Sequence, residues 1–401
     1  MLGKINLFLC KGGQTMRILI WTQNVSTGGG ARLLANLLPA MARQDDIELV
    51  RLVISPESNF KDRNNFSSYS NIEIVYYTGS IGSEVAKKFF HDCHVIYYFW
   101  PHLHDFVDVK RPNICTFHDT TILDFVPPFL DGNYISVYWR KSKDWLEKST
   151  NVVVPSQHVK SRLIAHFGNH LEEAIVIPHA ILPADYSSDQ LLNSDRETDL
   201  PEQYFVYPAN TSPHKNHYNL LLAYSKFIKR KDYPLVLFGS YTELLREQPP
   251  SWPNYSFFPT LVSLINRLEL KIDKDIYPLG FVNDRDVTPI IKNAKALVMP
   301  SLSEGGGSYP VEEALRLGTP VLCSDIPVMR EHLARHSAKV VWFDPESVDS
   351  ILEALEEMAV NYDEYKKSSI QGINDVTESW DDVAKKYIHA MRASYLKYYN
   401  K

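Results

Sequence analysis

Short apolar runs alternate with stretches of helical periodicity along most of the chain. The runs have strand length and fall into two series. The first series is Arg17–Gln23, Ile47–Ile54, Ile72–Tyr76, Val95–Phe99, Asn113–Thr116, Asn151–Val154 and Ala174–Ile177. The second series is Tyr204–Tyr207, Leu235–Phe238, Ile276–Leu279, Ala296–Met299, Pro320–Cys323 and Lys339–Trp342. This alternation predicts an α/β fold with two doubly wound parallel sheets, each covered by helices on both faces.

The two series are separated by residues 183–202, which are polar, rich in Ser and Asp, and bounded by prolines. We interpret this stretch as a linker. It divides the chain into two Rossmann-like domains, which we expect at residues 16–190 and 200–380. Ligands in such sheets bind at the carboxyl ends of the strands, so we expect the site in the cleft between the domains.

The last helical pattern, Trp380–Lys397, carries a broad apolar stripe that includes Val383, Tyr387 and Met391. Chain order leaves this stripe without a partner in the second domain. We therefore expect residues 381–401 to form a helix that crosses back onto the first domain.

The chain has 401 residues and a mass of 46.1 kDa, with 44% hydrophobic and 22% charged residues. These proportions are typical of a folded protein and exclude a disordered or collagen-like chain. The net charge of −6 argues against a nucleic-acid partner. None of the cysteines lies in a Cys-x-x-Cys pair, so we interpret them as reduced thiols of a cytoplasmic protein. No apolar run approaches the ~20 residues of a membrane span, so we expect any membrane association to be peripheral.

The strongest chemical signal is a glycine-rich loop that follows the strand Ala296–Met299 and opens a helix. It reads Ser303-Glu304-Gly305-Gly306-Gly307-Ser308-Tyr309-Pro310-Val311-Glu312-Glu313-Ala314. Glycines let a backbone approach a ligand closely, and a helix N-terminus favours a phosphate. Carboxylates accept hydrogen bonds from hydroxyls, so one of Glu304 and Glu312 could bind a sugar and the other the vicinal hydroxyls of a ribose. A glycine-rich turn with two solvated glutamates is the alternative.

A second segment, Tyr207–His217, joins the first strand of the second series to an amphipathic helix. It carries Lys215 at a strand-to-helix junction. A lysine at this edge of a parallel sheet is placed to neutralise a phosphate. Taken alone, a lysine in a first helical turn is more often an ordinary surface residue.

Together these segments resemble the retaining nucleotide-sugar glycosyltransferases of family four, the glycosyl transferases group 1, which have the two-domain GT-B fold. That family has a Glu, seven residues and a second Glu, and Glu304 and Glu312 have this spacing. Pro213–Asn216 resembles the family's phosphate-lysine segment. Further similar runs are Leu279–Val282, Ala294–Pro300, Gly318–Val321 and Ser324–Pro327.

The resemblance implies a metal-independent, retaining hexosyltransferase that uses no cofactor. Its co-substrate would be a UDP- or GDP-linked sugar, and its acceptor a saccharide or lipid-linked saccharide in polysaccharide or exopolysaccharide biosynthesis, near the inner face of the membrane. The first domain would bind the acceptor and the second the donor. The leaving diphosphate would face Lys215 and the amides of Gly305, Gly306 and Gly307. Glu304 would orient the donor sugar and share the catalytic role, and Glu312 would hold the ribose.

The resemblance also points to two places in the first domain. The loop Gly28, Gly29, Gly30 follows the first strand and would approach the donor phosphates. A tight strand-to-helix turn is the alternative for it. His118 lies two residues after Asn113–Thr116 and would contact the donor sugar, although a lone histidine is more often structural.

The chain departs from the family's pattern beside the donor. The family's Gly-Phe-Gly-Leu is Gly305-Gly306-Gly307-Ser308 here, and we keep Ser308 among the donor-binding residues. This departure favours one alternative, a catalytically weak subunit that only binds a sugar nucleotide. A GT-B-like nucleotide-sugar epimerase is a second alternative.

A second departure concerns the cations. Many members of the family have an arginine five residues before the lysine, and this chain has Asn210 there. We keep Asn210 among the donor-binding residues. The second cation would be absent or supplied by another residue, such as Arg32 or Arg285.

Two patterns that resemble metal sites are interpreted otherwise. Asp284-Arg285-Asp286 precedes a helical pattern, so we expect it to cap a helix. His102-Leu103-His104-Asp105 has no further ligand group spaced to close a site, so we expect a loop with exposed histidines. No metal ion is expected in the site.

Overall fold

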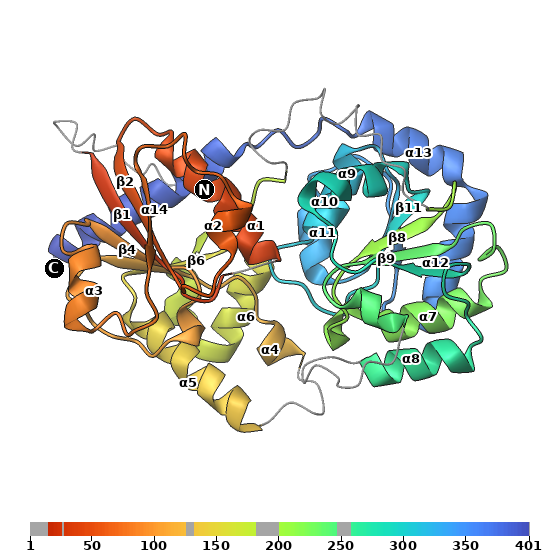
Figure 1. Cartoon of the computed structure of the whole chain (residues 1–401), viewed down its shortest axis with the longest axis horizontal. Helices are drawn as coiled ribbons and strands as arrows, with labels where there is room; N and C mark the ends of the chain where they lie inside the picture. Colours follow the sequence, from red (N-terminus) through yellow and green to blue (C-terminus); the bar gives the residue numbers. More distant parts are fainter. Residues whose placement is uncertain (1–14, 26–27, 126–131, 182–199, 247–257, 401) are drawn as a thin grey trace.

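The computed structural model describes residues 15–25, 28–125, 132–181, 200–246 and 258–400. The chain forms two lobes, each built on one parallel sheet (Figure 1). The predicted α/β class with two doubly wound sheets is confirmed. Most of the predicted linker, residues 183–199, lies outside the described residues.

The first sheet has the strand order β3-β2-β1-β4-β5-β6-β7, and neighbouring strands are parallel. Helix α1 covers one face of this sheet, and α3, α5 and α6 cover the other. Because both faces are buried, the strands read as continuous apolar runs. The strands are β1 Met16–Trp21, β2 Ile47–Ile54, β3 Ile72–Tyr76, β4 Val95–Tyr98, β5 Asn113–Thr116, β6 Asn151–Val154 and β7 Ile175–Val176. The helices of this lobe are α1 Gly29–Ala42, α2 Phe60–Arg63, α3 Glu84–Phe90, α4 Thr121–Asp124, α5 Gly132–Lys148 and α6 Gln157–Phe167.

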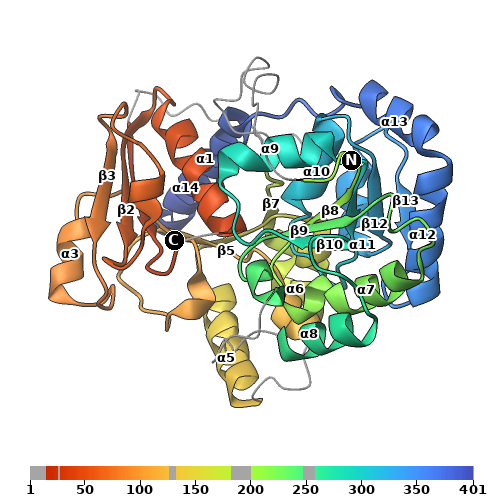
Figure 2. The ribbon, with the colours of Figure 1, turned by 45° about the vertical axis from the view of Figure 1, so that its right-hand side comes forward.

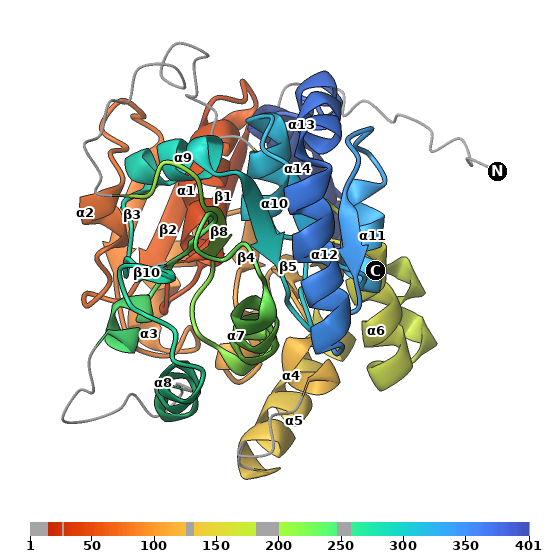
Figure 3. The same cartoon turned by 90° about the vertical axis from the view of Figure 1, so that its right-hand side faces the viewer.

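The second sheet has the order β10-β9-β8-β11-β12-β13 and is also parallel. Helices α7 and α12 pack against each other along it (Figure 3), and α10 packs on β11 and β12. The strands are β8 Phe205–Pro208, β9 Leu235–Phe238, β10 Ile276–Pro278, β11 Ala296–Met299, β12 Val321–Ser324 and β13 Val341–Phe343. The helices are α7 His217–Lys226, α8 Phe258–Arg267, α9 Asp284–Asn293, α10 Tyr309–Arg316, α11 Pro327–Leu333, α12 Val348–Val360 and α13 Tyr362–Gln371.

The strand bounds differ from the predicted ones by at most two residues, as at β1, which ends at Trp21 rather than Gln23. The helices that were not predicted from the sequence are α2, α3, α4, α8, α11 and α13. For α3 the reason is its short length, because its seven residues bury only Ala86 and Phe90 and so give no sustained apolar period.

Helix α14 (Trp380–Tyr399) returns from the second lobe and packs on α1, β4 and β5 of the first (Figure 1). A capping box starts it, in which the Asp382 N–H donates to Ser379 Oγ at 3.2 Å and the Ser379 N–H donates to the Asp382 carboxylate at 3.1 Å. Its apolar stripe joins the core beneath α1. The buried members are Trp380, Val383, Ala384, Tyr387, Ile388, Ala390 and Met391.

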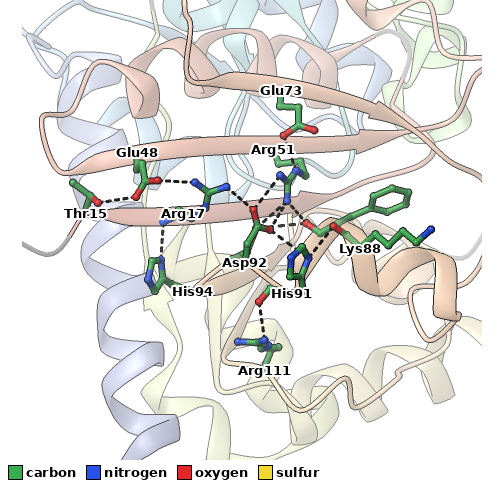
Figure 4. A network of polar contacts seen from close by, with 12 residues as sticks. Thr15, Arg17, Glu48, Arg51, Glu73, Lys88, His91, Asp92, His94 and Arg111 are labelled. Atoms are coloured by element: carbon green, nitrogen blue, oxygen red, sulfur yellow. Dashed lines mark hydrogen bonds and ion pairs between the residues drawn. The ribbon is translucent and has the colours of Figure 1, made fainter.

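An ion-pair network lies toward the amino-terminal ends of the first strands (Figure 4). Arg51 on β2 contacts Asp92 at 2.7 Å and Glu73 on β3 at 2.8 Å. Arg17 on β1 contacts Asp92 at 2.5 Å and Glu48 on β2 at 2.6 Å. Burial alone would raise the pKa of Asp92, but the two arginines hold it well below its usual range. The network joins three strands at the edge of the sheet away from their carboxyl ends. We therefore interpret it as a structural feature that holds neighbouring strands together and not as a ligand-binding site.

The cysteines in the described part of the chain, Cys93, Cys115 and Cys323, are buried and form no disulfide. Burial raises the pKa of Cys93 and of Cys115 to about 12, which makes both thiols unreactive. Cys10 lies outside the described residues. No helix among the described residues is long and apolar enough to cross a membrane.

Candidate active site

The two sheets turn the carboxyl ends of their strands toward one cavity between the lobes. The cavity has a volume of about 830 Å³, within the usual range for a small-molecule site. Helix α1 of the first lobe faces α9 and α10 of the second across it (Figure 2). The walls include the residues predicted from the sequence, namely Gly28, Gly29, Gly30, His118, Asn210, Lys215, Glu304, Gly305, Gly306, Gly307, Ser308 and Glu312.

Lys215 and Glu304 form an ion pair on the second lobe's side of the cavity. Lys215 Nζ lies 2.6 Å from Glu304 Oε1, and the two side chains are 20% and 11% exposed. The loops that carry them are joined by a hydrogen bond of 2.8 Å from the Leu302 N–H to the His214 carbonyl. The Tyr207 hydroxyl donates to the Lys215 carbonyl at 2.7 Å. These contacts hold one cation and one carboxylate in fixed positions at the strand ends.

The next residue, Asn216, explains why the chain turns sharply here. It has a left-handed backbone, with φ 58° and ψ 33°, and its side chain is buried. Its amide donates to the Pro300 carbonyl at 2.9 Å and to the Pro345 carbonyl at 2.7 Å. Asn216 therefore fixes the start of α7 and, through it, the position of Lys215.

Two of the three glycines after Glu304, Gly305 and Gly306, lie where the lobes touch. A Cβ on Gly305 would lie 2.3 Å from the His118 carbonyl oxygen, and a Cβ on Gly306 would lie 2.6 Å from Pro155 Cβ. Gly307 has φ 92°, and a Cβ there would lie 2.5 Å from the His332 ring. The sequence predicts that these glycines bind phosphate. The structure shows an additional steric reason for them: Gly305 and Gly306 lie against the first lobe, and Gly307 lies against His332 of its own lobe.

Glu312 and Glu313 are adjacent on α10 but face different groups. The Glu312 carboxylate accepts hydrogen bonds from His332 Nδ1 at 3.1 Å and from Arg335 at 2.6 Å, and it lies 3.4 Å from His336 Nε2. Burial would raise the pKa of Glu312, but these partners lower it to about 2. Both carboxylate oxygens of Glu312 are thus hydrogen-bonded to residues of α11 or of the segment that follows it.

Glu313 has a different environment. One of its oxygens contacts the Arg32 guanidinium of the first lobe. Its other oxygen, Oε2, is buried and has no hydrogen-bond partner in the part of the chain that the structure describes. Among the described residues, Glu313 therefore has a buried oxygen without a partner, whereas both oxygens of the predicted Glu312 are already paired.

His118 reaches the cavity from the first lobe. Its ring lies 4.4 Å from the Phe99 ring and 4.6 Å from the Trp100 ring, and Nε2 lies 2.9 Å from the Phe99 carbonyl oxygen. A carbonyl only accepts, so Nε2 carries the hydrogen and Nδ1 is an acceptor. Burial lowers the pKa of His118 to about 3, which keeps the ring neutral at pH 7. His118 is therefore suited to accept a hydrogen bond from a sugar hydroxyl.

Several cavity residues were missed in the sequence analysis as site residues. They are Asp119, His179, Tyr309 and Glu313. His179 follows a predicted strand just as His118 does, so a signal for it was present, and its ring stacks on Tyr309 at 5.8 Å. Burial raises the pKa of Asp119, and the nearby Glu304 carboxylate adds to this effect.

The patterns that resemble metal sites have other roles. Asp284-Arg285-Asp286 forms the first turn of α9, with Asn283 as the N-cap residue. His102 and His104 are half-buried and not exposed as predicted, and burial lowers the pKa of His102 to about 4. Within the described ranges, no group of three or more His, Cys, Asp or Glu side chains is arranged to hold a metal ion.

Comparison with known proteins identifies the class. The profile of the family "Glycosyl transferases group 1" matches residues 192–375. The O-antigen chain mannosyltransferase RfbU of Salmonella typhimurium is 26% identical over 275 residues, which are 66% of this chain and 70% of RfbU. The serotype-specific mannosyltransferase WbdA of Escherichia coli is 24% identical over 285 residues, which are 69% of this chain but 33% of WbdA. The chain thus spans about a third of WbdA.

Solved structures agree over nearly the whole chain. HepE of Anabaena, in complex with UDP and glucose, matches with a TM-score of 0.70 and 15% identity, over 94% of this chain and 99% of HepE. WaaG, a glycosyltransferase involved in lipopolysaccharide biosynthesis, matches with a TM-score of 0.66 and 13% identity, over 94% of this chain and 99% of WaaG. The fold is GT-B, the two-domain fold of glycosyltransferases. The chain is thus similar to the glycosyl transferases of group 1 in sequence over residues 192–375, and it shares the GT-B fold over nearly its whole length.

Proposed function

We propose that this glycosyltransferase moves a hexose from a nucleoside-diphosphate donor to a saccharide acceptor and retains the anomeric configuration. The observation that carries the proposal is the Lys215–Glu304 pair at the strand ends of the second lobe, which lines the same cavity as His118 of the first. A cation for the leaving diphosphate and hydrogen-bond acceptors for sugar hydroxyls thus meet in one cavity.

In the proposed reaction the bond from the anomeric carbon to the diphosphate oxygen breaks, and a bond to the acceptor oxygen forms. The acceptor hydroxyl attacks from the face that the diphosphate leaves, and the departing diphosphate takes the hydroxyl proton. Lys215 stabilises the negative charge that grows on the diphosphate. Glu304 and His118 accept hydrogen bonds from the donor sugar and orient it. The cavity between the lobes keeps out water that would hydrolyse the donor.

The relatives suggest which substrates to test first. RfbU and WbdA are mannosyltransferases, and the HepE structure holds UDP and glucose. We therefore propose mannose as the first donor sugar to test and glucose as the second, with acceptors from polysaccharide assembly.

The test of this function is a transfer assay with GDP-mannose and UDP-glucose in excess EDTA. The absence of a metal-ligand cluster among the described residues leads us to expect full turnover in the chelator. Nuclear magnetic resonance of the product should show the same anomeric configuration as the donor. An inverted product, or activity that returns only when Mg²⁺ or Mn²⁺ is added, would contradict the proposal.

We propose Glu313, in place of the predicted Glu312, as the acceptor of hydrogen bonds from the ribose hydroxyls, because its Oε2 has no partner among the described residues. Matched variants separate the roles of the two glutamates. We expect Glu313→Gln to weaken binding of the free nucleoside diphosphate about 10-fold, because hydrogen bonds to a charged group contribute about 1.5–3 kcal/mol. Glu312→Gln should lower stability and leave nucleotide affinity much less changed, since its partners are His332 and Arg335. Calorimetric titration measures the affinities, and a larger loss for Glu312→Gln would restore the original assignment.

A further inference from the structure

The cavity contains few fixed positive charges. Arg32 and Lys215 are the arginine and lysine residues among its lining residues in the described part of the chain. Lys215 is already paired with Glu304 at 2.6 Å. Asn210, which also lines the wall of the second lobe, is exposed and uncharged. A diphosphate carries more than one negative charge, so Lys215 alone leaves much of that charge uncompensated.

Arg32 is well placed to supply the second charge. It lies in the first turn of α1, directly after the glycine loop, and its N–H donates to the Gly28 carbonyl at 3.0 Å. A Cβ on Gly28 or on Gly29 would meet no atom within 4 Å, so this loop borders open space, and Gly28 has φ 83°. The loop therefore leaves room for a ligand beside Arg32.

The Arg32 side chain reaches across to the start of α10. Its guanidinium contacts the Glu313 carboxylate and lies 5.2 Å above the Tyr309 ring. Glu313 and Tyr309 belong to the second lobe, where the N-terminus of α10 itself favours an anion. Arg32 is thus held by a carboxylate at a position that favours an anion. A diphosphate resembles this carboxylate because it too is negatively charged and can accept two parallel hydrogen bonds from a guanidinium.

We propose that Arg32 is the second cation that binds the diphosphate of the donor, delivered from the first lobe. This inference rests on the proposed function. The diphosphate takes hydrogen bonds from the Arg32 fork on one side and from Lys215 on the other. Because Arg32 and Lys215 belong to different lobes, the diphosphate links the lobes, and nucleotide binding depends on their closure.

The test compares Arg32→Gln with Arg43→Gln in the full-length chain. Arg43 lies at the other end of α1, pairs with Asp381 on α14 at 2.7 Å and does not line the cavity. Each variant is titrated calorimetrically with UDP and GDP, and with the corresponding nucleosides that lack phosphates.

We expect Arg32→Gln to weaken nucleoside-diphosphate binding about 10- to 100-fold, with nucleoside binding changed less than about threefold. Arg43→Gln should bind the nucleoside diphosphates and the nucleosides with wild-type affinity. Arg32→Lys should recover part of the loss, because a point charge replaces the fork. Wild-type diphosphate affinity in Arg32→Gln, or an equal loss for the nucleoside, would overturn the inference. A wild-type protein that binds neither nucleotide would instead refute the proposed function itself.

Discussion

Lys215→Ala should lower kcat about 10²- to 10³-fold and leave the fold intact. Loss of one group that stabilises charge in a transition state typically has this effect. The charge of Lys215 matters most as the leaving diphosphate becomes more negative, so KM should change less than kcat. Lys215→Arg should restore activity only in part, since a planar fork replaces a compact charge. Initial rates at saturating donor give the measurement.

Lys226→Ala is the matched control for this variant. Lys226 lies on α7, is 53% exposed and pairs with Asp349 at 3.0 Å, away from the cavity. Its removal should leave kcat near that of the wild type. A folded Lys215→Ala variant that keeps more than about a third of the wild-type kcat, a barrier change below ~1 kcal/mol, would argue against a donor phosphate at this position.

Removal of residues 380–401 should unfold the first lobe. Helix α14 contributes Trp380, Tyr387 and Met391 to the core beneath α1, and each is at most 1% exposed. Loss of a single buried side chain of this size typically costs about 2–5 kcal/mol, whereas a whole domain is stable by only about 5–15 kcal/mol. Differential scanning calorimetry of the truncated chain should therefore lack the first lobe's transition.

Two point variants on α14 refine this prediction. Met391→Ala should destabilise the first lobe by about 2–5 kcal/mol, because Met391 is fully buried. Leu396→Ala, at a side chain that is 46% exposed, should stay within about 0.5 kcal/mol of the wild type. Equal effects of the two changes, or an unchanged first transition after truncation, would mean that α14 does not complete this core.

The strands were predictable because sheets with two buried faces produce continuous apolar runs. Val95–Tyr98 and Ala296–Met299 are buried at every position, so hydropathy alone locates them. The placement of Lys215 was predictable for a related reason, since a strand-to-helix junction fixes which edge of the sheet a residue occupies. The pairing of Lys215 with Glu304 was not, because it depends on how two loops pack together.

The choice between Glu312 and Glu313 shows where a sequence pattern becomes insufficient. Neighbouring helical residues point about 100° apart, so one position decides whether a carboxylate faces the cavity or a neighbouring helix. The partners of Glu312 come from residues 332–336, and the partner of Glu313 comes from the other lobe. Neither set is visible in the local sequence.

The glycine run illustrates the same limit. The sequence indicates that the backbone at Gly305 and Gly306 approaches something closely, and a ligand was the natural interpretation. The structure places His118 and Pro155 of the first lobe there. Contacts between lobes depend on their relative orientation, which no periodicity within either lobe records.

The most direct measurement of the central claim is a crystal structure with a bound nucleoside diphosphate. The account predicts one nucleotide in the cavity between the lobes, with its diphosphate between Lys215 and the N-terminus of α10 and its ribose hydroxyls at Glu313. A nucleotide bound outside this cavity, or a diphosphate that lies away from Lys215, would contradict it.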